Sequence, residues 1–196
     1  MMANWPTAWP TGPARYLPLD GGAGEGLEAE PGVVLQAMRR ALSGWRSDAG
    51  LIVQRMQEAA LQPAFAPQVM RLRIGADALR TLAQLATRLY AQSGNFTVLH
   101  LVTGCHALRV LMPYLDAPLR ALRSYWVAYA AGAAGVPSAA AAPALQAVPD
   151  WPEIVARALA SDDAHVVKLV YSCREEHCFY DWDDCRFAAA RAVSSA

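Results

Sequence analysis

The sequence predicts an all-α fold, a multi-helix array that follows an extended N-terminal lead-in rich in Pro and Gly. From Pro31 onward apolar residues recur at helical spacing, and no window alternates with a period of two, so no strand is predicted. Of the 196 residues, 55% are hydrophobic and 17% are charged, which is typical of a compact chain with a substantial core. We therefore expect an extended segment over residues 1–30 and a helical domain over residues 31–196.

Turn-forming residues divide the first half of the helical domain. Pro31 suits the first turn of a helix. Pro63 and Pro67 are expected to break the chain before a longer helix. Ser93-Gly94 should end that helix, and Asn95 is a suitable N-cap for the next one.

The second half is divided by a linker rich in Ala and Pro, expected over about residues 134–150. Pro152 opens a short helix, and Ser161-Asp162 should cap the helix that follows. The expected helices cover about residues 31–45, 48–61, 77–93, 95–113, 119–133, 152–159 and 184–193, and one more helix begins after Ser161-Asp162 and carries His165 and His177.

Charge and composition argue against several partners. Seventeen basic and seventeen acidic residues cancel, with no basic run, so we expect no nucleic-acid partner. The stretch from Ser124 to Pro149 carries no charge, but it is rich in Ala and interrupted by Gly and Pro, so we expect no membrane span. The first residues lack the pattern of a signal peptide. The four cysteines lack C-x-x-C spacing, which favours reduced thiols in a cytoplasmic protein.

Three of the four histidines lie in two apolar segments, residues 96–109 and 162–171. On a helix, His100 and His106 lie about 120° apart, a wider sector than two neighbouring ligands usually span. They fit either a metal site or core histidines that bond to backbone carbonyls. His165 and Lys168 are three residues apart and share one helix face.

Lys168 has apolar neighbours on both sides in the sequence. Burial lowers the pKa of a lysine, and the neutral amine binds metal or reacts with carbon dioxide to form a carbamate. The alternatives are an ion pair with Asp162 or Glu175, or a surface lysine. His177 falls on the opposite side of the same helix beside acidic residues, so we expect a surface histidine.

Both histidine segments resemble those of the questin oxidase family of helical oxidoreductases. Further similarity is found at Tyr16-Leu17-Pro18-Leu19, in residues 51–73, and at Ala121-Leu122-Arg123-Ser124-Tyr125-Trp126. The resemblance implies oxygen insertion or ring cleavage of a quinone or polyketide-type aromatic, at a non-haem Fe²⁺ site. The positions that match the family's ligands are His100, His106, His165 and Lys168. The family's fungal chemistry also implies NADPH, for which the sequence shows no recognisable site.

The resemblance is to the C-terminal half of the longer family members, whose N-terminal half adds residues to the pocket. We therefore expect homo-oligomerisation or a companion chain, together with a small aromatic substrate. The alternative is a truncated, non-catalytic helical protein or an interaction module that needs a partner chain.

Overall fold

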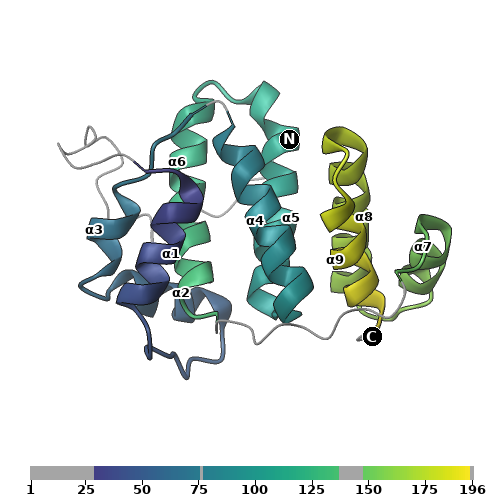
Figure 1. Cartoon of the computed structure of the whole chain (residues 1–196), viewed down its shortest axis with the longest axis horizontal. Coiled ribbons are helices and arrows are strands. Elements are labelled where there is room, and N and C mark those ends of the chain that lie inside the picture. The colour runs from purple at the N-terminus through teal and green to yellow at the C-terminus, as the bar shows by residue number, and fades with distance from the viewer. Residues whose placement is uncertain (1–28, 76, 137–147, 195–196) are drawn as a thin grey trace, which may run out of the picture. The chain divides into compact units, whose positions relative to one another are not determined.

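The computed structural model describes residues 29–75, 77–136 and 148–194, and these ranges are built from helices (Figure 1). Within them no strand is present, and one isolated bridge pairs Ala29 with Leu72. The all-α prediction is therefore confirmed. Most of the expected lead-in, residues 1–28, and the middle of the expected linker, residues 137–147, lie outside the described residues.

The chain divides into two compact units. Unit 1 comprises the residues up to Ile74 together with Leu119–Gly135, and unit 2 comprises Gly75–Pro118 with the residues from Val136 onward. The helices of unit 1 are α1 (Pro31–Ala41), α2 (Ile52–Ala60), α3 (Phe65–Val69) and α6 (Pro118–Ala134). Those of unit 2 are α4 (Ala78–Ser93), α5 (Phe96–Leu111), the short 3-10 helix η3 (Met112–Tyr114), α7 (Trp151–Leu159), α8 (Ala164–Tyr180) and α9 (Asp183–Ser194).

Unit 1 is organised around a buried tryptophan. The indole Nε1 of Trp126 donates a hydrogen bond to the carbonyl oxygen of Val69 at 2.8 Å, which joins α6 to the end of α3. Phe65 and Met38 are fully buried, and α1 packs against α3. The bond satisfies the one polar group of the indole, so the large side chain can be buried without loss of hydrogen bonding.

Three features of unit 1 differ from the sequence prediction. Helix α1 ends at Ala41, before the predicted position, because a turn follows in which Gly44 adopts φ 87°. Helix α2 begins at Ile52. The break expected at Pro63 and Pro67 instead contains α3, with Pro67 in its first turn. Backbone N–H groups in the first turn have no intrahelical acceptor, so a proline, which lacks this group, is tolerated there.

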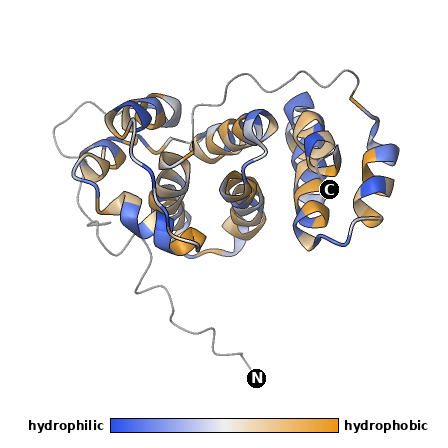
Figure 2. Ribbon diagram, turned by 90° about the horizontal axis from the view of Figure 1, so that it is seen from below, coloured by the Kyte–Doolittle hydropathy of each residue, from blue (hydrophilic) through white to orange (hydrophobic). Residues whose placement is uncertain are grey.

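Unit 2 carries the two histidine segments on α5 and α8. Helix α4 packs against α5 and α9, and α8 packs against α5, α7 and α9. Figure 2 colours the helices by hydropathy and shows α7, at the right edge, with both a hydrophobic and a hydrophilic side. Ile154 and Ala158 form its buried side, while Glu153 and Arg157 are exposed. The amphipathic pattern read from the sequence therefore corresponds to burial here.

Helix α5 begins as the sequence predicts. Gly94 ends α4 in the left-handed region, with φ 59°, and Asn95 follows in an extended conformation. The Asn95 side-chain oxygen accepts hydrogen bonds from the backbone N–H groups of Thr97 at 2.8 Å and Val98 at 3.2 Å. This cap sets the first turn of the helix that bears His100.

One segment of the described residues, Phe96–Tyr114, is long and apolar enough to cross a membrane by length and composition alone. It comprises α5 with η3 and not the uncharged Ser124–Pro149 stretch considered from the sequence. In the structure α5 is packed against α4 and α8. A helix in the core of a protein meets the same criteria of length and composition.

Replacing Asn95 with Ala should lower the free energy of unfolding by about 1 kcal/mol, because two N–H groups of the first turn of α5 lose their acceptor. Asp77→Ala is the matched control, since Asp77 occupies the N-cap of α4 but makes no side-chain capping bond. Urea unfolding of both variants measures the difference. Equal destabilisation by the two substitutions would contradict a specific capping role for Asn95.

Candidate functional site

Helices α5 and α8 lie side by side and run parallel. The contacts between them show the direction, since residues later in α5 meet residues later in α8. His100 contacts His165, His106 contacts Tyr171, and Arg109 bonds to Glu176. We call these six residues the α5–α8 seam. Its start, near the N-termini of both helices, differs in composition from its end.

The start of the seam is a cluster of three rings. The ring of Phe96 lies edge-on to His100 and to His165, with centroid distances of 4.8 Å in both cases. The two imidazole centroids are 5.5 Å apart. Two histidines from distant parts of the sequence therefore meet, as the metal hypothesis requires.

Hydrogen bonds fix the orientation of both imidazoles. Nδ1 of His100 lies 2.9 Å from the carbonyl oxygen of Phe96, and Nδ1 of His165 lies 2.9 Å from Oδ1 of Asp163. Because a carbonyl or carboxylate oxygen only accepts, each Nδ1 carries the proton. In the neutral ring Nε2 then has a lone pair available for a metal or for another donor.

Asp163, rather than the expected Ser161-Asp162, caps α8. Its Oδ1 accepts from the backbone N–H of His165 at 2.8 Å as well as from the ring. These hydrogen bonds hold the pKa of Asp163 below its usual value, with smaller contributions from the charges of His165 and Lys168. One carboxylate thus begins the helix and orients the histidine in its first turn.

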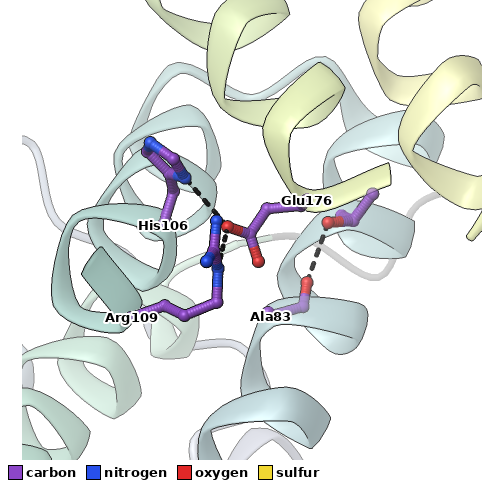
Figure 3. A network of polar contacts seen from close by, with 5 residues as sticks. Ala83, His106, Arg109 and Glu176 are labelled. Carbon is purple, nitrogen blue, oxygen red and sulfur yellow. Dashed lines mark hydrogen bonds and ion pairs between the residues drawn. The ribbon is translucent and has the colours of Figure 1, made fainter. Parts of the chain in front are cut away.

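The end of the seam is a buried ion network, shown in Figure 3. His106 and Arg109 of α5 both point at the same carboxylate oxygen of Glu176 on α8. His106 Nδ1 lies 2.8 Å from Oε1, and Arg109 Nε donates to it at 2.7 Å. The other oxygen, Oε2, is buried and has no hydrogen-bond partner. Glu176 and His106 are 3% and 8% exposed, so this network is largely shielded from water.

Two neighbouring aromatic rings surround this network. The ring of Tyr171 lies edge-on to His106 with centroids 5.5 Å apart, and the guanidinium of Arg109 lies 4.1 Å from the ring centre of Phe179. Such a contact stabilises a partly desolvated cation. The charge of Glu176 is therefore matched by a guanidinium that is itself held in place.

The structure thus separates the four residues singled out in the sequence. His100 and His165 are brought together, whereas His106 lies six residues, about 9 Å, further along α5 and is bonded to Glu176. Lys168 is exposed, which matches the alternative of a surface lysine, and the burial expected to neutralise its amine is not present. Among the described residues, no group of three or more His, Cys, Asp or Glu side chains is placed to hold a metal ion.

The expectation that His177 is a surface histidine is wrong. It is half-buried near the end of α8, where its Nδ1 donates to the carbonyl oxygen of Trp182 at 2.8 Å and its ring lies 5.4 Å from that of Trp151. The reason is that α8 ends at Tyr180 and the chain turns back through Asp181, whose φ is 56°. This turn brings the Trp182 carbonyl to the imidazole.

Glu176 and Arg109 were missed as site residues. In the sequence, Glu176 is one of two adjacent acidic residues and resembles a solvated charge. Only its position on the helix distinguishes it from Glu175, which is less buried in the structure. Arg109 follows His106 by three residues, a spacing that places both on one side of α5. That shared face was the available signal.

Buried thiols lie near the same carboxylate. Burial raises the pKa of Cys173 well above its usual value and that of Cys185 to about 12, and the nearby charge of Glu176 adds to both shifts. Burial, with the Glu176 charge again adding, raises the pKa of Tyr180 to about 12. These groups are therefore neutral near pH 7 and unsuited to act as nucleophiles.

A comparison with known protein families matches residues 37–173 to the questin oxidase-like family. This match covers more than half of the chain and includes both histidine segments, so the chain belongs to the questin oxidase-like family. Membership in this family indicates an oxidoreductase. Searches of curated proteins and of solved structures each find no match.

Replacing Asp163 with Ala should make the free energy of unfolding change less with pH in the acid range. A carboxyl group whose pKa is lowered by folding stabilises the folded state above its unfolded pKa of about 3.9, and that contribution is lost as the pH falls through the lower folded value. The difference between wild type and Asp163→Ala should therefore be full at pH 7 and shrink toward pH 2, as measured by urea unfolding. Asp162→Ala is the control; a matching pH dependence there would contradict the assignment.

Thiol labelling should separate the four cysteines. Cys178 is exposed, whereas Cys105, Cys173 and Cys185 are buried. In the native protein at pH 8, a disulfide reagent should label one thiol rapidly and the others at the rate of unfolding, because the reagent reaches a buried sulfur only when the protein opens. Cys178→Ser should remove the rapid phase. Rapid labelling that survives this substitution would show that the buried thiols are accessible.

Proposed function

We propose that this chain is an oxidoreductase that inserts oxygen into, or cleaves, the ring of a quinone or polyketide-type aromatic at a non-haem iron site. The observation that carries the proposal is the contact between His100 and His165, with Nε2 available on both rings. Imidazole suits iron as a ligand. Ligating histidines commonly donate the other ring nitrogen to a carbonyl or carboxylate, as these two do.

His106 and Lys168 are proposed as the further ligands. His106 has the same arrangement, with Nδ1 bonded to a carboxylate and Nε2 available. Lys168 follows His165 by one turn of α8 and would contribute as a carbamate formed with carbon dioxide. Since His106 is bonded to Glu176 and Lys168 is exposed, the proposal requires α5 and α8 to adjust when iron binds.

Iron would supply the redox chemistry that activates dioxygen. The protein's residues would hold and orient the reactants: Asp163 and the Phe96 carbonyl keep the two imidazoles in the required tautomer. The exposed rings of Phe96 and Tyr171 offer faces on which a planar aromatic substrate would stack. NADPH is proposed as the reductant from the family resemblance.

The alternative proposal is an interaction module whose site is completed by a second chain, either another copy or a companion. It is supported by the exposed apolar side chains at the end of α5 and in η3, namely Val110, Leu111 and Tyr114. Apolar groups that lie together at a surface commonly mark a contact with another chain.

We also propose a cytoplasmic location. It is supported by Cys105, Cys173, Cys178 and Cys185, which form no disulfide in the described part of the chain. Reduced thiols are typical of that compartment.

Iron binding tests the leading proposal. Under anaerobic conditions the wild type should bind Fe²⁺, and His100→Ala or His165→Ala should weaken binding by at least about tenfold. His177→Ala is the control, because its imidazole bonds to Trp182 and not to the pair. Metal content after desalting, together with titration calorimetry, measures both. Absence of binding by the wild type, or equal loss in His177→Ala, would contradict the site.

Turnover separates the two proposals. Purified protein with Fe²⁺, dioxygen, NADPH and a hydroxyanthraquinone should yield a product with added oxygen, detected by mass spectrometry. Activity of the isolated monomer would support the enzyme. Activity that appears only in an oligomer, or only with a second chain present, would support the module completed by a partner.

A further inference from the structure

We infer that two copies of this chain pair through the outer side of α5 and α8, with each helix antiparallel to its counterpart. Helices α4 and α9 cover the inner side of α5 and α8. On the outer side, exposed or half-buried residues recur at alternating intervals of four and three, which keeps each set on one side of its helix. We call this surface the α5–α8 face. Its residues are Phe96, His100, Thr103, Ala107, Val110 and Tyr114 from α5 and η3, and Ala164, Lys168, Tyr171, Glu175 and Cys178 from α8.

The segment Phe96–Tyr114 is more apolar than its surroundings explain. Of its most apolar stretch, 39% of the residues are buried. Its one residue of the Lys, Arg, Asp or Glu types is Arg109, which is bonded to Glu176. Phe96 and Tyr114, at the two ends of the segment, are 49% and 82% exposed. A continuous apolar surface of this kind commonly marks a contact with another molecule.

The exposed apolar area is sufficient for a stable dimer. With about 200 Å² for a complete aromatic side chain, the exposed fractions of four rings on or beside the α5–α8 face give about 500 Å² per copy. These rings are Phe96, Tyr114, Tyr171 and Phe179. Exposed aliphatic side chains beside them extend this area toward the roughly 800 Å² that each partner buries in a standard interface; they are Val110, Leu111 and Val167.

The charges on α8 favour a second copy as the occupant and give its direction. Lys168 and Glu175 are two helical turns apart with Tyr171 between them, and within the described residues neither side chain forms an ion pair. A two-fold axis near Tyr171 makes α8 antiparallel to its copy and places each Lys168 opposite the partner's Glu175. In a parallel pair each charge would face its own like charge, which is unfavourable. A hydrocarbon surface would offer neither charge a partner.

The same axis makes α5 complementary to itself. Because Tyr171 contacts His106, an axis near Tyr171 passes α5 between Thr103 and Ala107. These two small side chains then meet across the axis, where the helices approach each other most closely. At the ends, Phe96 lies opposite the partner's Tyr114. The axis chosen by the charges on α8 therefore also matches small with small and large with large on α5.

The pairing gives the histidine pair an apolar wall that a single copy lacks. His100 would lie opposite the partner's Val110, so the second copy would shield His100 and His165 from water. The use of this wall in an oxygenase pocket rests on the proposed function, whereas the pairing itself does not. The pairing is inferred for the metal-free protein, in which Lys168 is an exposed lysine.

The oligomeric state of the full metal-free chain, measured by sedimentation velocity, gives the first test. The wild type should sediment as a dimer, and Ala107→Arg should sediment as a monomer because it places a charge at the centre of the interface. Ala156→Arg, at an exposed position on α7, is the matched control and should remain a dimer. A monomeric wild type would overturn the inference. Flotation of that monomer with phosphatidylcholine vesicles would assign the α5–α8 face to a membrane instead.

Exchange of the two charges tests the direction of pairing and uses only side chains on the surface of α8. Lys168→Glu and Glu175→Lys should each raise the dimer dissociation constant by about tenfold or more, because like charges then face each other. The double variant restores opposite charges and should restore the dimer. A dimer that is indifferent to the single exchanges, or a double variant that stays monomeric, would overturn the antiparallel pairing. Since no iron is present, these results are separate from the Fe²⁺ titration that decides the proposed function.

Discussion

A single carboxylate oxygen joins the two helices that bear the histidine segments. Glu176 Oε1 takes a hydrogen bond from His106 and another from Arg109, so α8 is tied to two consecutive turns of α5. The cost of burying these charges is offset only while all three partners are present, and removing one partner of such a pair typically costs about 3–5 kcal/mol. Together with the ring contacts of Phe96 with His165 and of His106 with Tyr171, this contact sets the relative register of α5 and α8 at which His100 meets His165.

The histidines share one pattern of hydrogen bonding. Each has Nδ1 bonded to an oxygen: a backbone carbonyl for His100 and His177, and a carboxylate for His106 and His165. The pattern alone therefore does not identify a ligand, since His177 shares it at the end of α8. The feature that distinguishes His100 and His165 is the neighbouring imidazole.

The sequence predicted the helices better than the site. Helical periodicity, Gly94 and the Asn95 cap located α5 to within two residues, because those signals are local. Spacing also placed His165 and Lys168 on one face of a helix. It could not show that Lys168 is exposed or that Glu176 is buried, because both depend on which side of α8 meets α5. Glu175 and Glu176 are chemically identical neighbours, and only tertiary packing separates them.

The parallel course of α5 and α8 bears on how the protein folds. His106 and Glu176 are 70 residues apart in the chain, and the intervening segment includes α6, which belongs to the other unit. Parallel neighbours need such a long connection, and closing it costs chain entropy before the contact is gained. Contacts of this range slow folding, whereas the local turns of each helix form early. We therefore expect the contacts of the candidate site to form after the local turns of its individual helices.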